Sequence, residues 1–243
     1  MRRLPPGAVG CMDRRAALGY RRGMCGRYVR SSPRAVVADA FGVVPGPEID
    51  FTPRYNVCPG DRVLAVALAG ERRLGTLRWG LVPSFAKDAG AGPRAINARA
   101  EGLDRRPAFR AAFGRRRCLI VADGFYEWRR EGRGRTPFFA RPRSGRPLAF
   151  AGLWERWRAP DGPALTTCAI VTCPANATLA PIHERMPVVL DEADREAWLA
   201  PAAEPAALRA LLRPCPEDVL EVYEVSRLVN APRNDSPECI APV

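Results

Sequence analysis

Four polar residues occur where the local sequence favours chemistry: Cys25, Asn97, Glu127 and His183. Cys25 directly follows Met24, so a chain that begins at Met24 and loses that methionine carries the cysteine at its N-terminus. Its α-amine and thiol then lie on adjacent carbon atoms, and an α-amine with a pKa of about 7.7–8.0 is partly neutral near pH 7. In a chain that begins at Met1, the same cysteine is internal and offers only its thiol.

The other three residues have side chains suited to orienting a substrate and moving protons. Asn97 lies in "RAINARAE", and Glu127 follows the Asp123-Gly124 break in "VADGFYEWRR". His183, the only histidine of the chain, lies in a turn-like stretch before the apolar run "MPVVL". A carboxylate and an imidazole that converge on one cleft form a general acid and base.

Each of these residues also has a structural interpretation. His183 can be a hydrogen-bonded structural residue, and Asn97 can be a turn or cap residue. Glu127 can pair with a neighbouring arginine on the surface, and Cys25 can be one more buried thiol. The spacing of the four residues along the chain does not decide between these alternatives.

The elements that must position these residues are mainly strands. Alternating or continuous apolar patterns predict strands within 61–68, 74–80, 115–130, 136–142, 147–157, 165–172 and 222–230. Helices are predicted over 31–42, capped by Ser32 and ended by Gly42, and over 102–114, closed by Gly114. Two more are predicted at 191–200, capped by Asp191, and at 204–212, begun by Pro205.

This order of elements predicts an α+β fold. Strands outnumber helices and are separated by hairpin-like turns, and no regular strand–helix alternation suggests a parallel sheet. We expect antiparallel sheets curved around one core, with helices outside. Residues 1–23 have no periodicity and are interpreted as an extension or a mis-assigned start, followed by a single domain over 24–243.

Composition narrows the class of partner. The formal net charge is +12 and Lys87 is the only lysine, so arginine supplies nearly all the positive charge. Guanidinium groups match phosphate oxygens, which favours a nucleic acid, although an arginine-rich proteome would also raise the arginine content. No apolar run reaches the roughly 18 residues of a membrane span. The opening segment does not resemble a secretory signal, so a cytoplasmic protein is expected.

The eight cysteines do not suggest a metal centre or a disulfide framework. None of them forms a C-x-x-C pair, and a single histidine leaves few further ligands. Most are expected to be small buried apolar residues, as the strand-like surroundings of Cys118 and Cys168 indicate. Neither a metal nor a small-molecule cofactor is therefore predicted.

Seven motifs in a fixed order resemble one known family. They are "MCGRY" at 24–28, "RYNVCPG" at 54–60, "LRWGLVPSF" at 77–85, "INARAE" at 96–101, "ADGFYEW" at 122–128, "IHERMPVVL" at 182–190 and "VSRLVN" at 225–230. Each alone is weak, but the ordered set closely resembles the SRAP family, the SOS response-associated peptidases or abasic-site processing proteins. The resemblance runs from Met24 nearly to the C-terminus.

The resemblance implies a barrel-like β core and a protein that captures abasic sites in single-stranded DNA. By motif position, the catalytic residues are Cys25, Asn97, Glu127 and His183. Their product is a thiazolidine crosslink between the abasic site and the α-amine and thiol of an N-terminal Cys25. This reading implies a DNA-damage enzyme, expected to be a monomer that associates with the nucleoid when bound to damaged DNA.

The resemblance also assigns DNA contacts. They are Arg27, Arg99 and Arg185 on phosphates and Phe85 as an aromatic wedge against bases. The sequence departs from the family at residue 86, because the alanine there replaces a second large aromatic. Since base–aromatic stacking contributes roughly 1–3 kcal/mol per base, DNA binding is expected to be weakened rather than lost.

Two other functions remain open at this point. Cys25, His183 and Asn97 are the residue types of a papain-like cysteine peptidase, and self-cleavage before Cys25 would expose its α-amine. A passive nucleic-acid-binding module would keep the arginines but tolerate loss of Glu127 and His183.

Overall fold

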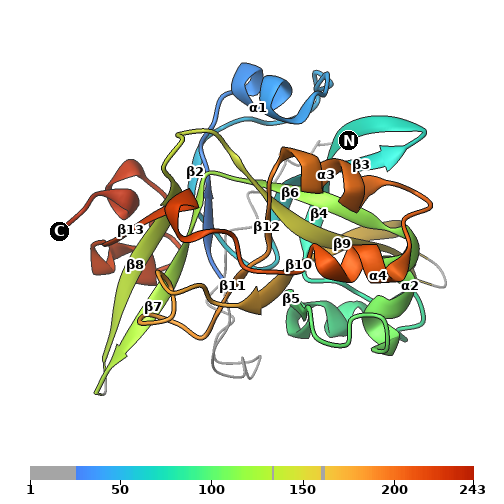
Figure 1. Ribbon diagram of the computed structural model, residues 1–243. Coiled ribbons are helices and arrows are strands. Elements are labelled where there is room, and N and C mark those ends of the chain that lie inside the picture. Colours follow the sequence, from blue (N-terminus) through green and yellow to red (C-terminus); the bar gives the residue numbers. More distant parts are fainter. Residues whose placement is uncertain (1–25, 133, 160–161) are drawn as a thin grey trace, which may run out of the picture.

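The computed structural model describes residues 26–132, 134–159 and 162–243, which form two β-sheets with short helices around them (Figure 1). Cys25 and the predicted extension over 1–23 lie outside the described residues. The predicted α+β class with a barrel-like core is confirmed, as the following paragraphs detail.

The core of the fold is a closed barrel of five strands. Going around it, β4 pairs with β3, β3 with β6, β6 with β9, β9 with β10, and β10 with β4 again. Only the β10–β4 pairing is parallel among these five. The strands are β3 (Arg62–Ala69), β4 (Glu71–Trp79), β6 (Arg117–Ala122), β9 (Leu148–Arg158) and β10 (Ala164–Pro174).

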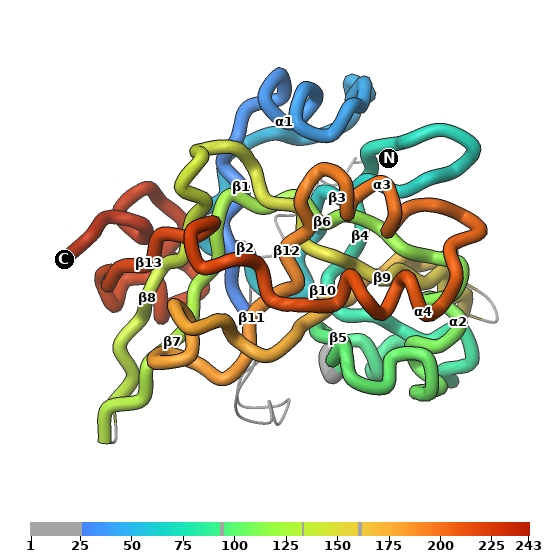
Figure 2. The backbone as a smooth tube through the Cα atoms, in the orientation of Figure 1, coloured from blue at the N-terminus to red at the C-terminus, as the bar shows by residue number. Residues whose placement is uncertain are grey.

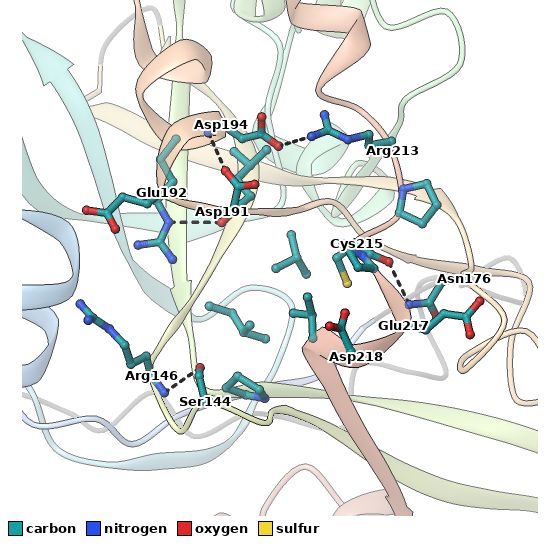
Figure 3. Close-up of a pocket in the computed structure, with 18 of the residues that line it drawn as sticks. Ser144, Arg146, Asn176, Asp191, Glu192, Asp194, Arg213, Cys215, Glu217 and Asp218 are labelled. Carbon is teal, nitrogen blue, oxygen red and sulfur yellow. Dashed lines mark hydrogen bonds and ion pairs between the residues drawn. The ribbon is translucent and has the colours of Figure 1, made fainter.

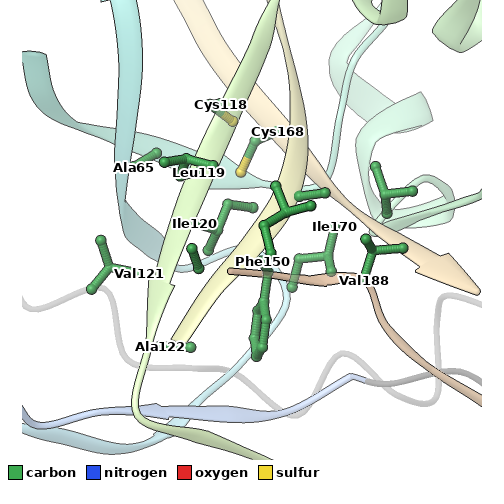
Figure 4. Close-up of a cluster of buried hydrophobic side chains, with 14 of the residues drawn as sticks. Ala65, Cys118, Leu119, Ile120, Val121, Ala122, Phe150, Cys168, Ile170 and Val188 are labelled. Atoms are coloured by element: carbon green, nitrogen blue, oxygen red, sulfur yellow. The ribbon is translucent and has the colours of Figure 1, made fainter. Parts of the chain in front are cut away.

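The barrel interior is apolar and tightly packed. β6 is buried along its whole length, and Phe150 and Ile170 point into the same cluster (Figure 4). Gly152 on β9 lies against the β6 side chains, where a Cβ atom would come within 2.8 Å of the Cys118 sulfur. The continuous apolar runs in the sequence therefore correspond to strands that need no polar face.

A second, open sheet carries the hairpin of β7 and β8, which projects from the body of the molecule (Figure 2). Its order is β13-β8-β7-β1-β2. Its strands are β1 (Tyr28–Arg30), β2 (Arg54–Val57), β7 (Gly124–Glu131), β8 (Gly134–Pro142) and β13 (Leu220–Glu224). The chain crosses from barrel strand β6 into β7 at Gly124, where a Cβ atom would come within 2.6 Å of the Ala140 carbonyl oxygen.

Three short strands extend the barrel sheet. β5 (Asn97–Arg99) pairs in parallel with β10, and β11 (Arg185–Pro187) pairs in antiparallel fashion with the last residues of β10. β12 (Val189–Leu190) pairs with β9. The C-terminal half of β10 thus leaves the barrel and carries β5 and β11.

The helices are short and peripheral. They are α1 (Arg34–Phe41), α2 (Pro107–Arg115), α3 (Glu192–Leu199) and α4 (Pro205–Ala210), with 3₁₀ turns η1 (Ala89–Arg94), η2 (Glu217–Val219), η3 (Arg227–Asn230) and η4 (Pro237–Ile240). α1 lies at the opposite end of the molecule from α2 (Figure 1). The predicted Asp191 cap and Pro205 start are confirmed.

Three local predictions are wrong in detail. Ser32 does not cap α1, whose N-cap is Pro33, because the Ser32 hydroxyl donates to Asp123 instead. Gly114 lies inside α2, which begins only at Pro107 and ends at Arg115. The predicted strand over 222–230 ends at Glu224, and its remainder forms η3.

Arg117, at the start of β6, fastens two helices to the barrel. Its buried guanidinium donates to the carbonyls of Phe113 and Gly114 at the end of α2 and of Trp198 and Ala200 at the end of α3, over 2.6–2.8 Å. Helix C-termini carry unpaired carbonyls and partial negative charge, which one buried arginine satisfies here. Burial lowers the pKa of Arg117 from its ordinary value.

None of the helices within the described residues is long and apolar enough to cross a lipid bilayer.

Candidate active site

Glu127 and His183 come together in space although 55 residues separate them. The His183 Nδ1 lies 3.9 Å from the Glu127 Oε2, and the two side chains are 14% and 4% exposed. Glu127 is therefore buried, and the alternative in which it pairs with a neighbouring arginine on the surface is wrong. The neighbouring Arg129 instead donates to Glu131, further along the same strand. A carboxyl group and an imidazole placed this way are the residue types of a general acid and base.

His183 is held by the backbone of Arg185, two residues ahead of it. The Arg185 N–H and the Arg185 carbonyl oxygen each lie 3.1 Å from the His183 Nδ1. The turn before β11 is itself fixed, because the His183 N–H donates to the Leu179 carbonyl. The imidazole orientation thus follows from the way the chain enters β11.

Asn97 and Arg99 lie on β5, which pairs with the same strand, β10, as β11 does. Asn97 pairs with Ile170 and Arg99 with Thr172 on β10, so β5 and β11 flank the same strand end. Asn97 lies within a strand and is buried, which makes the turn or cap interpretation wrong. Arg99 is exposed.

Arg185 is buried and has partners inside the protein. Its guanidinium makes two hydrogen bonds to Glu101, of 2.6 and 2.9 Å, and a third to the Thr172 carbonyl at 2.6 Å. Its Nε is buried and has no hydrogen-bond partner within the described chain. The Arg185 hydrogen bond holds the pKa of Glu101 below its ordinary value.

Arg27 links the first described residues to the C-terminal segment. Its buried guanidinium donates to the Asn56 side chain at 2.7 Å and to the Val229 carbonyl at 2.9 Å. Asn56 in turn donates to the carbonyls of Val229, Ala231 and Asn234. The Arg27 carbonyl accepts from the Tyr126 N–H at 3.0 Å, next to Glu127.

Phe85 lies apart from these groups, on the loop between β4 and β5. Its side chain is 67% exposed, which is unusual for a phenylalanine in this fold. The loop is anchored behind it, where the Trp157 indole donates to the Ala86 carbonyl at 2.8 Å and the Val82 N–H donates to Thr167. An exposed aromatic ring on an anchored loop has a free face on which a nucleic-acid base can stack.

The cysteines of the described chain do not supply a nucleophile. Cys58, Cys118, Cys168, Cys173, Cys215 and Cys239 are all buried and free of disulfides. Burial raises the pKa of Cys173 to about 12 and of Cys215 to about 11, and it raises those of Cys118 and Cys168 well above the ordinary value. Buried, protonated thiols are inert. The expectation that Cys118 and Cys168 are buried is confirmed.

A separate hollow of about 990 Å³ lies between the β8–β9 turn, α3 and the segment before β13 (Figure 3). None of the predicted site residues lines it. Its polar groups largely satisfy one another, as Asp194 pairs with Arg213 and Asn176 donates to the Cys215 carbonyl. Across the residues that the structure describes, no group of His, Cys, Asp and Glu side chains is arranged to hold a metal ion.

Two further residues of the site were not singled out from the sequence. Glu101 binds Arg185, and Asn56 binds Arg27. Both stand inside motifs that the sequence already set apart, Glu101 in "INARAE" and Asn56 in "RYNVCPG". Motif membership was the available signal, and only the structure gives the partners.

Comparison with known proteins gives the family. The sequence model described as "SOS response associated peptidase (SRAP)" matches residues 24–232. The chain is 42% identical to the "Abasic site processing protein YoqW" of Bacillus subtilis (strain 168), over 89% of this chain and 99% of that protein. It is 33% identical to the "Abasic site processing protein HMCES" of Gallus gallus, over 79% of this chain and 67% of that protein.

Solved structures share the fold. A Bacteroides thetaiotaomicron protein superposes with a TM-score of 0.80 at 24% identity, covering 90% of this chain and all of the other. A Bordetella bronchiseptica protein superposes with a TM-score of 0.72 at 26% identity, covering 83% of this chain and all of the other. Taken with the sequence matches, these likenesses mean that the chain belongs to the SOS response associated peptidase (SRAP) family.

Proposed function

We propose that this protein processes abasic sites in single-stranded DNA by forming a covalent thiazolidine crosslink through Cys25. The observation that carries the proposal is the buried Glu127–His183 pair, 3.9 Å apart, beside the start of β1. The relatives' printed names, abasic site processing protein, supply the substrate class.

The chain geometry supports Cys25 as the reacting residue. β1 runs antiparallel to β7 with Tyr28 opposite Phe125, so the same register sets Gly26 opposite Glu127. Cys25 directly precedes Gly26 in the sequence, and successive Cα atoms are about 3.8 Å apart. The other cysteines of the described chain are buried.

The reaction needs both groups of an N-terminal cysteine. The α-amine adds to the C1′ aldehyde of the open abasic sugar, and the carbinolamine loses one water to give an imine. The thiol then adds to the imine carbon while its proton goes to nitrogen, which closes a five-membered ring. Closure is intramolecular and gains the high effective molarity of a positioned nucleophile. The active form therefore has a free α-amine on Cys25.

The remaining residues have distinct roles in this proposal. Asn97 orients the α-amine, and Glu127 moves protons as the carbinolamine loses water. His183 gives a proton to the sugar ring oxygen, which opens the hemiacetal to the aldehyde. Arg27, Arg99 and Arg185 contact phosphates of the DNA. Arg99 is exposed, whereas Arg27 and Arg185 are buried and also donate hydrogen bonds within the protein.

An intact-mass experiment tests this function. Protein that begins at Cys25 is incubated with single-stranded DNA containing one abasic site, and a heat-stable adduct equal to the sum of both masses minus one water is expected. Cys25→Ala serves as the test variant and Cys118→Ala, a buried thiol inside the barrel, as its control. Normal crosslinking by Cys25→Ala, or by protein whose α-amine is acetylated, would contradict the proposed chemistry.

Self-processing is a second proposed activity, which the family's peptidase description favours. In a chain that begins at Met1, the Cys25 thiol attacks the Met24 carbonyl carbon, the Met24–Cys25 amide bond breaks, and the α-amine takes up a proton as residues 1–24 become a thioester on Cys25. Water then hydrolyses the thioester, which releases residues 1–24 as a carboxylic acid and restores the thiol. Mass spectrometry of the full chain over time measures this release. Turnover of unrelated peptides would instead indicate a general cysteine peptidase, and equal crosslinking after loss of Glu127 and His183 would indicate a passive binding module.

A further inference from the structure

The edge strand β11 leaves two backbone groups of Arg185 unused by the sheet. In the β10–β11 ladder, the Val188 N–H donates to the Val171 carbonyl at 2.9 Å, and the Ala175 N–H donates to the Glu184 carbonyl at 3.0 Å. Bonded positions alternate along an antiparallel pair. Arg185, opposite Pro174, therefore occupies a position whose N–H and carbonyl point away from β10.

Both of these groups meet the same imidazole nitrogen. The Arg185 N–H and the Arg185 carbonyl oxygen lie 3.1 Å from the His183 Nδ1. A bare Nδ1 accepts from the N–H, whereas a protonated Nδ1 donates to the carbonyl. The same frame thus holds His183 in either tautomer and in the imidazolium form. Within the described chain, the His183 Nε2 has no hydrogen-bond partner, which leaves it for a substrate.

The side chain of Arg185 is what keeps this frame in place. Glu101 binds the two ends of the guanidinium at 2.6 and 2.9 Å, and the Thr172 carbonyl accepts from one of them at 2.6 Å. The same Thr172 carbonyl accepts the Ala100 N–H at 2.8 Å, directly before Glu101. A bidentate carboxylate–guanidinium pair fixes orientation as well as distance. Glu101 therefore ties β5, β10 and β11 together at one point.

We propose that Glu101 is a positioning residue that, through Arg185, holds His183 so that its imidazole exchanges protons without rotating. In its carboxylic acid form, Glu127, 3.9 Å from Nδ1, gives its proton to that nitrogen through one bridging water and becomes a carboxylate, while Nε2 gives a proton to the substrate oxygen. The ring passes from the Nε2–H to the Nδ1–H tautomer, and its partner changes from the Arg185 N–H to the Arg185 carbonyl. The transfer of a proton to the substrate rests on the proposed function, whereas the fixed orientation of the His183 imidazole does not.

Nuclear magnetic resonance tests the imidazole directly, because the chain has a single histidine. Protein labelled with ¹⁵N-histidine reports the protonation of Nδ1 and Nε2 without overlap. In the wild type we expect the neutral ring as the Nε2–H tautomer, since a buried backbone N–H rarely lacks an acceptor. In Glu101→Gln we expect both ¹⁵N shifts to move toward a mixture of tautomers.

Crosslinking kinetics provide the second measurement. Glu101→Gln is expected to crosslink about tenfold more slowly at saturating DNA. This loss is smaller than the 10²–10⁴-fold rate increase that a positioned acid or base typically contributes, because the imidazole is still present. Its affinity for single-stranded DNA is expected to stay equal or rise, because a negative charge beside the strand is lost. Asp104→Asn is the matched control, as it removes a nearby carboxylate paired with Arg209 at 2.9 Å, and it should keep the wild-type rate and spectrum.

Each outcome bears on the proposal. Wild-type ¹⁵N shifts in Glu101→Gln, or a loss of rate matched by loss of folded protein, would overturn it. Glu101→Asp keeps the charge but shortens the side chain, and intermediate shifts and rates are expected from it. If both variants unfold, Glu101 is a stability residue and the proposal is wrong. Failure of the wild type to crosslink would count against the proposed function, while the two spectra would still decide the role of Glu101.

Discussion

The closed barrel and the strand ends beside it differ in the side chains that they bury: the barrel buries apolar side chains, and the strand ends bury polar ones. In the barrel, five strands pair in a ring, and residues such as Cys118, Ile120 and Cys168 pack in a fully buried apolar cluster. Where β5 and β11 flank the end of β10, the side chains of Asn97, Glu127 and His183 are polar and largely buried. A closed ring leaves no free backbone group, whereas an edge strand such as β11 has N–H and carbonyl groups to hold an imidazole.

The apolar barrel is suited to stability, and the proposed chemistry belongs to the polar strand ends beside it. A cysteine inside the barrel has a raised pKa and no access to solvent, so it cannot serve as a nucleophile. A polar side chain at the edge obtains its partners from the neighbouring backbone. Substitutions in the two regions should therefore separate stability from activity.

The largest expected effect is on stability, in the variant Arg117→Ala. Four helix-end carbonyls lose their donor, and hydrogen bonds to charged groups contribute about 1.5–3 kcal/mol each, less the gain from no longer burying a charge. We expect the free energy of unfolding, measured by urea denaturation, to fall by about 3 kcal/mol. Arg115→Ala, an exposed arginine at the end of α2, is the control. The crosslinking rate per folded molecule should stay unchanged. A lower rate per folded molecule would show that stability and activity do not depend on separate regions.

The next effect is on activity, in Glu127→Gln. The amide keeps the shape but cannot move a proton, so the crosslinking rate at saturating DNA should fall about 100-fold. Thermal stability should stay nearly unchanged, because the amide has almost the same shape and volume as the carboxyl group. Glu131→Gln, on the same strand but exposed and paired with Arg129, should leave the rate unchanged. A Glu127→Gln variant that crosslinks normally would remove Glu127 from the mechanism.

The smallest effect concerns the loop that belongs to neither region. Phe85→Ala removes an exposed aromatic whose stacking on a base contributes roughly 1–3 kcal/mol, so affinity for single-stranded DNA should weaken about tenfold. Fluorescence anisotropy with a labelled oligonucleotide measures this change. Val44→Ala, which alters an apolar side chain that is 96% exposed elsewhere, should not affect binding. Equal binding by both variants would mean that Phe85 does not contact bases.

The same contrast explains what was predictable from the sequence. The barrel strands have continuous apolar runs such as "CLIVA", and their class and approximate bounds followed from that pattern. The apolar pattern did not predict that Glu127 and His183 lie close together, because their proximity depends on how β7, β10 and β11 meet in three dimensions. The two residues were assigned to one site only because the order of the motifs resembles a known family. Ser32 was placed wrongly because Asp123, 91 residues away, binds its hydroxyl. The catalytic roles of Cys25, Asn97, Glu127 and His183 and the roles of the DNA-contacting residues remain predictions.

The strand β10 serves both regions, and this has a consequence for motion. Its first half pairs with β9 and β4 in the barrel, and its last residues carry β5 and β11. Opening the site therefore strains the same strand that closes the barrel. Amide hydrogens of Ile170 to Thr172 should exchange with solvent only as the whole domain opens, as in the most protected units of a protein. In this fold the strands that carry Asn97 and Arg185 stay in register because both pair with the strand that also closes the barrel.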